Sequence, residues 1–147
     1  MDYRNSLLTG AADVHFKRLQ SVQNAAARLV SGARHDHITP VLTKLHWLSV
    51  RKRVVFKTLV VVWKCLNGTA PGYLSELCIP VASASGRQHL RSASTDVLQV
   101  TRARTMIGRR SFAVAGPSLR NSLPAARIPE MILHTFKRQL KAYLFHI

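Results

Sequence analysis

Apolar residues recur at intervals of three and four positions between residues 13 and 31. The stripe consists of Leu19, Val22, Ala26 and Leu29, widened by Val30. Lys17, Arg18 and Arg28 lie off the stripe, so the pattern predicts an amphipathic helix. Gly32 follows directly and suits the left-handed position that ends a helix.

Residues 50–66 carry a second helical pattern. Its apolar positions are Val50, Val54, Val55, Leu59, Val62, Trp63 and Leu66. The six valines of this stretch favour a β-strand. Seventeen residues without a turn signal favour a helix instead, ended by Asn67-Gly68.

Proline signals predict two short helices beside this one. Thr39-Pro40 fits a helix start, with the hydroxyl at the N-cap, and the helix should run to about His46. Pro71 opens another helical turn that should run to about Leu77.

The second half of the chain is less regular. Residues 79–95 are rich in Ser, Ala, Gly, Arg and His, which predicts a mobile, exposed loop. Weak alternation over 97–105 allows one short extended segment. A helix is expected over 111–123, which Gly116-Pro117 should bend or split. The last helix should begin near Pro129, and its apolar stripe requires a partner surface. That stripe consists of Ile132, Phe136, Leu140 and Leu144, supported by Leu133 and Tyr143.

These patterns predict a mainly α fold, a small helical domain with a Ser/Arg-rich loop. It spans residues 1–147 as a helical part (1–78), a flexible loop (79–95) and a basic C-terminal part (96–147). A length of 147 residues and an apolar content of 47% are sufficient for a buried core.

Charge changes the picture most. The chain has 22 Lys and Arg against six Asp and Glu, a formal net charge of +16. The cations are divided evenly between the two halves, so they do not form a basic tail on a neutral domain. Such a surplus repels itself unless a polyanion is near, and nucleic acid is the common partner. A ribosomal-type protein, an organelle-targeted protein and a fragment separated from an acidic neighbour are the alternatives.

Clusters of cations are the candidate phosphate contacts. They place long donors without an adjacent acid, as a surface that follows phosphates requires. The cluster at the first turn of the 50–66 helix opposes the helix dipole, which argues against a role in helix stability. An ordinary solvated face is the alternative, although such faces usually mix both signs. The candidate nucleic-acid-binding residues are Arg51, Lys52, Arg53, Arg102, Arg104, Arg109, Arg110, Lys137, Arg138 and Lys141.

Base-specific recognition is poorly supported. Aromatic residues make up 7% of the chain. Trp47 and Trp63 lie in apolar stripes and are predicted to be core residues rather than base-stacking platforms. Contact with the RNA or DNA backbone is therefore the expected mode.

No catalytic constellation is visible. The acidic residues are scattered singly, whereas a two-metal site needs converging carboxylates. No phosphate-binding loop or nucleophile elbow is present either. His35-Asp36-His37 is the densest set of ligand types, with His46 or His89 as further candidates. A polar loop is the better interpretation, because structural zinc sites carry paired Cys or His.

Cys65 and Cys78 lack disulfide-scaffold or metal-site spacing, so they are expected to be small buried residues in a reducing compartment. No signal peptide is visible, and no apolar run is long enough to span a bilayer. A nuclear or cytoplasmic location is therefore expected rather than secretion. We expect no metal, cofactor, membrane or small-molecule substrate.

A succession of motifs covers nearly the whole chain. They are DYRNSLL (2–8), RLQSVQNAAARLV (18–30), DHITPVL (36–42), LHWL (45–48), RVVFK (53–57), LNGTAPGYL (66–74), RRSFAVAGPSL (109–119), NSLP (121–124) and TFKRQLK (135–141). In this order they resemble the region after the fingers and palm in jockey-like non-LTR (LINE-type) retrotransposon reverse transcriptases.

The resemblance implies a helical segment near the template and primer backbones, in a polyprotein that performs target-primed reverse transcription. In that family the polymerase aspartates lie upstream of this region, and the endonuclease lies further upstream. Neither is in this chain, so the resemblance implies no enzymatic activity of its own. The implied partners are RNA or DNA and the remainder of the reverse transcriptase.

Three positions depart from the family pattern. Ser49 stands in place of a proline, Arg4 in place of a cysteine and Arg120 in place of a tryptophan. Arg120 would remove packing or bury a charge, at a cost on the order of 3 kcal/mol or more, which argues against independent folding. A decayed or truncated copy, translated from an internal Met1, fits these departures.

Several alternatives remain open. The chain could dock onto a missing polymerase domain through its last helix, or be a decayed fragment with no independent function. A retained host protein with a new nucleic-acid role is a further alternative. The scattered acids disfavour an enzyme.

Overall fold

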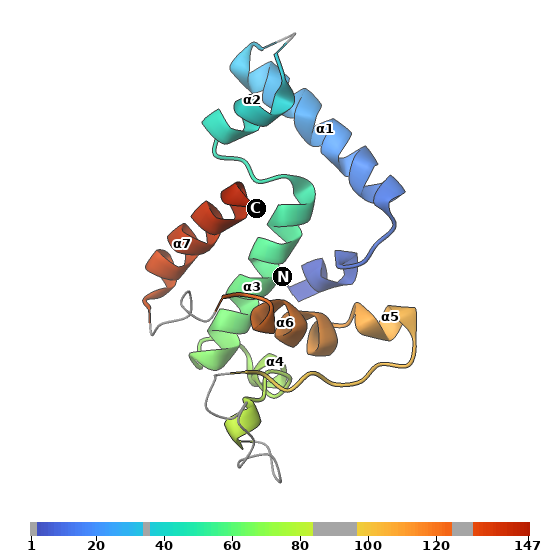
Figure 1. The fold of residues 1–147 in the computed structure, drawn as a ribbon, viewed down its shortest axis with the longest axis vertical. Coiled ribbons are helices and arrows are strands. Elements are labelled where there is room, and N and C mark those ends of the chain that lie inside the picture. Colours follow the sequence, from blue (N-terminus) through green and yellow to red (C-terminus); the bar gives the residue numbers. More distant parts are fainter. Residues whose placement is uncertain (1–2, 34–35, 84–96, 125–130) are drawn as a thin grey trace.

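The helix over residues 50–66 is the element around which the others pack (Figure 1). The computed structural model describes residues 3–33, 36–83, 97–124 and 131–147. The elements are the 3-10 helix η1 (Tyr3–Leu8), α1 (Asp13–Ser31), α2 (Ile38–Lys44), α3 (Val50–Leu66), α4 (Gly72–Ser75), the 3-10 helix η2 (Val81–Ser83), α5 (Met106–Arg109), α6 (Phe112–Asn121) and α7 (Leu133–His146). The prediction of a mainly α fold is confirmed.

Local signals placed the long helices well. Both α1 and α3 have the predicted bounds, and Gly32 ends α1 with a φ of 70°. Helix α2 begins before Thr39, so the prediction of a Thr39 N-cap is wrong. His37 holds that position, and Pro40 is the third helical residue. A proline fits there because the first turn leaves its N–H groups unpaired anyway.

Two predicted segments lie partly outside the described residues. Of the predicted loop at 79–95, positions 84–95 are not described, and the part before them contains the short helix η2. The predicted start of the last helix near Pro129 also lies outside the described residues, and α7 is assigned from Leu133.

Helix α6 is continuous, so the prediction that Gly116-Pro117 splits it is wrong. Both residues are buried where α6 packs on α3. A Cβ atom on Gly116 would lie 3.0 Å from Cγ2 of Val62 and 3.1 Å from Cε2 of Phe112. The absence of a side chain therefore permits close packing of α6 on α3. This packing compensates for the backbone hydrogen bond that Pro117 cannot make.

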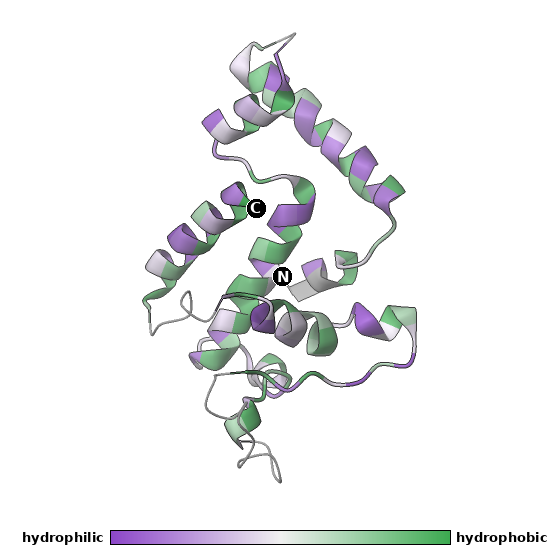
Figure 2. Ribbon diagram, viewed as in Figure 1, coloured by the Kyte–Doolittle hydropathy of each residue, from purple (hydrophilic) through white to green (hydrophobic). Residues whose placement is uncertain are grey.

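Helix α3 contributes to two apolar clusters. The first combines its end with α4, α6 and the following segments: Val61, Val62, Cys65, Leu74, Cys78, Leu98 and Phe112. The second combines the other side of α3 with α7: Leu48, Leu59, Phe136, Leu140 and Leu144. Figure 2 shows the hydrophobic colour along most of α3, after a hydrophilic first turn. A helix with apolar residues on more than one side is expected at the centre of a fold.

The apolar stripe of α7 finds its partner surface within the chain. Phe136, Leu140 and Leu144 are buried, and the Phe136 ring stacks on Trp63 with 5.9 Å between centroids. Trp47 packs in the α1–α2 cluster, so the prediction that both tryptophans are core residues is confirmed. Of the predicted α7 stripe only Ile132 stays exposed. The stripe that would dock onto a missing polymerase domain is therefore covered by the chain itself.

Helix α1 buries a different face from the one that its apolar stripe would favour. Its buried residues are Phe16, Gln23 and Ala27, whereas Val22 is 69% exposed and Leu29 is 85% exposed. Two glutamines hold this orientation. Gln23 Nε2 donates to the Leu48 carbonyl at 2.8 Å, and the Val50 N–H donates to Gln20 Oε1 at 2.9 Å. The second bond satisfies a first-turn N–H of α3 that would otherwise lack a helical acceptor.

The segment before α5 is held at Leu98 from both sides. An isolated antiparallel bridge pairs it with Pro80, and this is the extent of β-type pairing in the described residues. On the other edge, the Asn121 side chain accepts from Leu98 N at 2.9 Å and donates to Leu98 O at 2.8 Å. The expected extended segment over 97–105 is therefore reduced to this one bridge.

We expect Asn121→Ala to lower the free energy of unfolding by about 1–3 kcal/mol, because Leu98 would lose both partners of its buried backbone. Urea denaturation followed by circular dichroism measures the change. Ser122→Ala is the matched control, since its hydroxyl bonds only within α6 and is exposed. Equal effects of the two substitutions would show that the Asn121 clamp contributes nothing.

Candidate nucleic-acid interface

One side of the molecule gathers cations from three parts of the chain. Arg102 and Arg104 precede α5, Arg109 ends it, and all three side chains are exposed. Arg109 and Ala103 line a cavity of about 450 Å3 together with Thr9, which follows η1. Four residues after Thr9, α1 begins. This juxtaposition connects the α5 arginines to the cations at the start of α1. Lys17 lies one turn after Asp13, on the side of α1 that Arg51 contacts. We call Lys17, Arg51, Arg102, Arg104 and Arg109 the arginine face.

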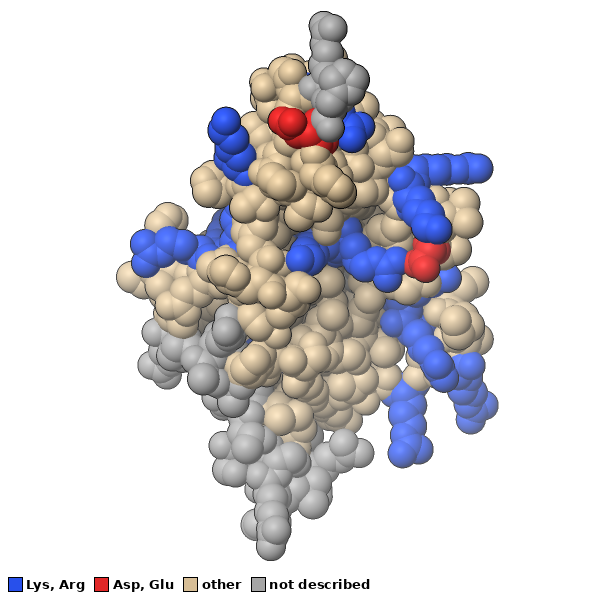
Figure 3. All heavy atoms as spheres, turned by 45° about the horizontal axis from the view of Figure 1, so that its top comes forward, with Lys and Arg blue, Asp and Glu red and all other residues tan. Residues whose placement is uncertain are grey.

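Figure 3 shows the consequence on the surface. Lys and Arg side chains are densest along the right-hand edge, where Figure 1 places the start of α1 and α5, and acidic side chains are sparse. Lys17 was not among the predicted contacts. The signal that could have found it was its place off the apolar stripe, one turn after Asp13.

Arg51 is partly engaged within the chain. Its guanidinium pairs with Asp13 and lies over the Phe16 ring, 4.7 Å from the centroid. The Arg51 and Asp13 side chains are 62% and 73% exposed, so water screens the pair. Arg51 therefore joins α3 to α1 while its remaining donors stay accessible to a ligand.

The structure does not bring all ten predicted contacts together. Lys137, Arg138 and Lys141 lie on α7, which Figure 1 places on the opposite side of α3 from α5. Lys52 belongs with them, because it lines a cavity of about 380 Å3 together with Phe145 of α7. The predicted residues thus form two separate basic surfaces.

Two further predicted contacts lie elsewhere. Arg53 shares the remaining side of α3 with Lys57 and Lys64 at helical spacing, a stripe that the sequence reading did not single out. Arg110 is half-buried, and its Nε atom is buried without a hydrogen bond in the described part of the chain. Arg110 is therefore a poor phosphate donor, unlike its exposed neighbour Arg109.

Arg120 is buried on α6, with 7% of its surface exposed. An arginine at this position was expected either to remove packing or to bury a charge. The structure shows the second outcome, a buried charge. A buried guanidinium cannot reach phosphate, so Arg120 belongs to the interior and not to either basic surface.

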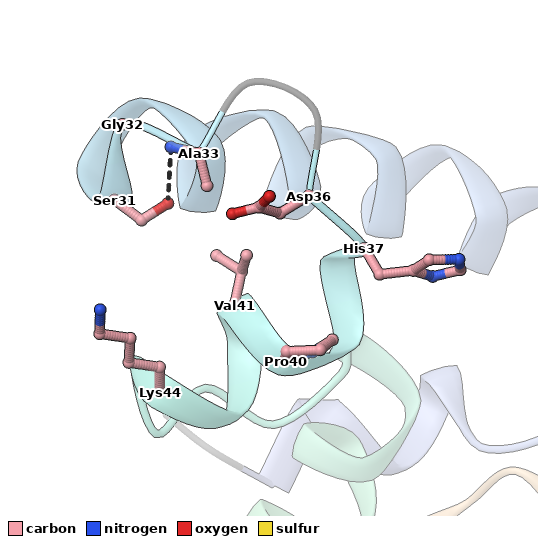
Figure 4. A pocket seen from close by; sticks show the side chains of 8 residues that line it. All are labelled: Ser31, Gly32, Ala33, Asp36, His37, Pro40, Val41 and Lys44. Atoms are coloured by element: carbon pink, nitrogen blue, oxygen red, sulfur yellow. Dashed lines mark hydrogen bonds between the residues drawn. The ribbon is translucent and has the colours of Figure 1, made fainter.

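The His35-Asp36-His37 motif does not form a ligand cluster in the described residues. Figure 4 shows the Asp36 carboxylate and the His37 ring pointing in different directions, at a cavity of about 520 Å3 that Lys44 also lines. His35 lies outside the described residues. Across the described ranges, no group of three His, Cys, Asp or Glu side chains is close enough to hold a metal ion.

Cys65 and Cys78 are both buried in the apolar cluster that the end of α3 forms with α4 and α6, as expected for small core residues. A hydrogen bond between the two thiols lowers the pKa of Cys65 and raises the pKa of Cys78. Burial further raises the pKa of Cys78. The pair is enclosed by apolar side chains, away from both basic surfaces.

No family model, curated protein or solved structure matches the chain. Within the residues that the structure describes, no helix combines the length and the apolar character needed to cross a membrane.

We expect Arg51→Ala to lower the free energy of unfolding by no more than about 1 kcal/mol, because exposed ion pairs and exposed cation–π contacts are each worth that or less. The loss should shrink when urea unfolding is repeated at high salt. Lys64→Ala, which removes the same charge from the far end of α3, is the control. A loss well above 2 kcal/mol would mean that Arg51 holds α1 in place.

Proposed function

We propose that the chain binds the sugar-phosphate backbone of RNA or DNA without marked sequence preference, through its arginine face. The observation that carries this proposal is the excess of cations. Six carboxylates can neutralise at most six of the 22 Lys and Arg side chains. The rest repel one another in the folded state, and a polyanion removes that repulsion by releasing its own counterions.

The arginine face is the better of the two basic surfaces for this role. Arg102, Arg104 and Arg109 are exposed, whereas Lys137 and Lys141 are half-buried along α7. Guanidinium groups donate two parallel hydrogen bonds to a phosphate and shed water more easily than ammonium groups. The contacts come from α1, α3 and the segment that contains α5, so they can span several phosphates of one strand.

Contact with the backbone fits better than contact with bases. Both tryptophans are half-buried against apolar clusters, so neither indole is displayed as an open stacking platform. None of the long helices presents a row of amide side chains to solvent. Gln20 and Gln23, which could read base edges, are committed to Val50 and Leu48.

We further propose that the chain derives from the region after the palm of a LINE-type reverse transcriptase and has no polymerase activity of its own. Support comes from the order of its motifs and from the scattered carboxylates. Inspection of the reading frame upstream of Met1 for paired polymerase aspartates tests the origin. Metal-dependent primer extension by the purified chain would contradict the second part.

Binding to a fluorescent 20-nucleotide duplex, measured by anisotropy, should weaken about 10³-fold or more between 50 and 200 mM salt if about six phosphates are contacted. Replacing Arg102, Arg104 and Arg109 together by Gln should weaken binding at 100 mM salt and reduce the slope of log K against log salt by about 3.

The matched control is the triple variant Lys137→Gln, Arg138→Gln and Lys141→Gln, which lowers the net charge by the same amount on α7. It should retain most of the affinity. Equal losses in both variants would mean diffuse attraction without a binding face. A flat salt response of the unaltered chain, or no binding at low salt, would overturn the proposal.

A further inference from the structure

Within the described residues, the apolar stripe of α1 is left largely in solvent. Leu19, Val22, Leu29 and Val30 are exposed by 45%, 69%, 85% and 66%, and Ala26 is half-buried. The two glutamine bonds to Leu48 and Val50 fix α1 with this stripe outward. The exposure is therefore a consequence of specific contacts on the opposite face of α1. Helix α1 itself lies at the margin of the fold (Figure 1).

We propose that this stripe is a docking surface for an acidic amphipathic helix of a partner protein. The row runs the length of a helix of 19 residues, roughly 28 Å. Such a straight ridge of Leu and Val side chains is complementary to the apolar ridge of a second helix.

Size argues that charge must assist the docking. One helix face covers a strip of roughly 28 by 10 Å, well below the roughly 800 Å² that each partner buries in a typical stable complex. Burial of the stripe alone would therefore give weak binding. Electrostatic attraction between the partners increases the rate of association and the specificity of so small an interface.

The charges beside the stripe are positive. Arg18 was expected off the stripe, but it lies four residues from Val22 and eleven from Leu29, on the same line of the helix, so it interrupts the apolar row. Lys17 and Arg28, eleven residues apart, lie on the next line of the helix surface. Asp13 is the one carboxylate on α1, and it pairs with Arg51. Glu or Asp side chains flanking the partner's apolar ridge would meet these cations.

Two other occupants fit less well. A second copy of the chain would bring another +16 charge against the same cations. Insertion of the stripe into a lipid surface would carry Arg18 among acyl chains, because Arg18 is in line with Val22 and Leu29, whereas an acidic helix offers Arg18 a carboxylate. An acidic helix satisfies both the apolar row and its basic border.

A defined probe tests the proposal. The probe is a fluorescein-labelled 21-residue helical peptide with leucines three and four positions apart and Glu at the flanking positions. A second peptide keeps the leucines and carries Lys in place of Glu. Anisotropy with the full chain at 150 mM salt should show saturable binding of the Glu peptide and at least tenfold weaker binding of the Lys peptide.

Neighbouring substitutions on α1 separate specific docking from general attraction by a basic protein. Val22→Asp and Ser21→Asp introduce the same charge at adjacent exposed positions, Val22 on the stripe and Ser21 in line with Lys17 and Arg28 on its basic border. Because Ser21→Asp also weakens the attraction for Glu side chains, any further loss in Val22→Asp reports the apolar contact. Val22→Asp should weaken binding at least tenfold more than Ser21→Asp. Leu29→Asp is the second stripe variant, should Val22→Asp reduce the helix content seen by circular dichroism.

The basic border has its own test. Arg18→Gln combined with Arg28→Gln should weaken binding of the Glu peptide several-fold more than Lys64→Gln combined with Lys44→Gln, which removes equal charge from α3 and α2. No saturable binding, or equal effects of the stripe and off-stripe variants, would overturn the proposal.

Two further results would assign the stripe to another occupant and overturn the proposal as well. One is a dimer in sedimentation velocity that Val22→Asp dissociates, which would indicate a second copy. The other is binding to vesicles of phosphatidylcholine and phosphatidylglycerol that Val22→Asp abolishes, which would indicate a lipid surface. The duplex-binding assay is independent of this stripe, and we expect Val22→Asp to affect duplex binding no more than Ser21→Asp does.

Discussion

Burial of α3 on nearly every side is the constraint on which the rest of the structure depends. Its last turns pack with α4, the Leu98 segment and α6, and its middle packs with α7. Because the apolar positions of α3 face more than one side, several neighbours are needed to cover them, while Arg53, Lys57 and Lys64 occupy the remaining side. The absence of a Cβ at Gly116 lets α6 approach Val62 closely enough to close one of these contacts.

Because the interior consists of apolar clusters, nearly all the described Lys and Arg side chains lie at the surface. Arg120 is the exception among the described residues, with its side chain buried on α6. The outward cations are not spread as an even shell, because α7 and α5 lie on opposite sides of α3 and carry separate groups. A chain with this architecture therefore offers a polyanion two distinct surfaces, of which the arginine face is the more accessible.

Helix α1 shows how a few polar bonds can outweigh hydrophobicity. Turning its stripe inward would bury Val22 and Leu29, each worth roughly 1.5–3 kcal/mol when fully buried. It would also break the bonds of Gln20 to Val50 and of Gln23 to Leu48, and it would expose Phe16. The observed orientation keeps the polar bonds and leaves the stripe available. The two faces of α1 thus have separate roles, one in folding and one at the surface.

The sequence by itself determined the long helices α1 and α3 and the sign of the net charge. Periodicity, Gly32 and Asn67-Gly68 are local signals. The bounds of α1 and α3 could therefore be predicted from the residues of each helix and those directly after it. Only the tertiary structure decided which face of α1 is buried, whether α6 is continuous and which cations share a surface. Each of these depends on residues far apart in sequence, such as Gln23 with Leu48, Val62 with Gly116 and Leu98 with Asn121. No local pattern specifies such pairs, because their energies arise only when the elements meet.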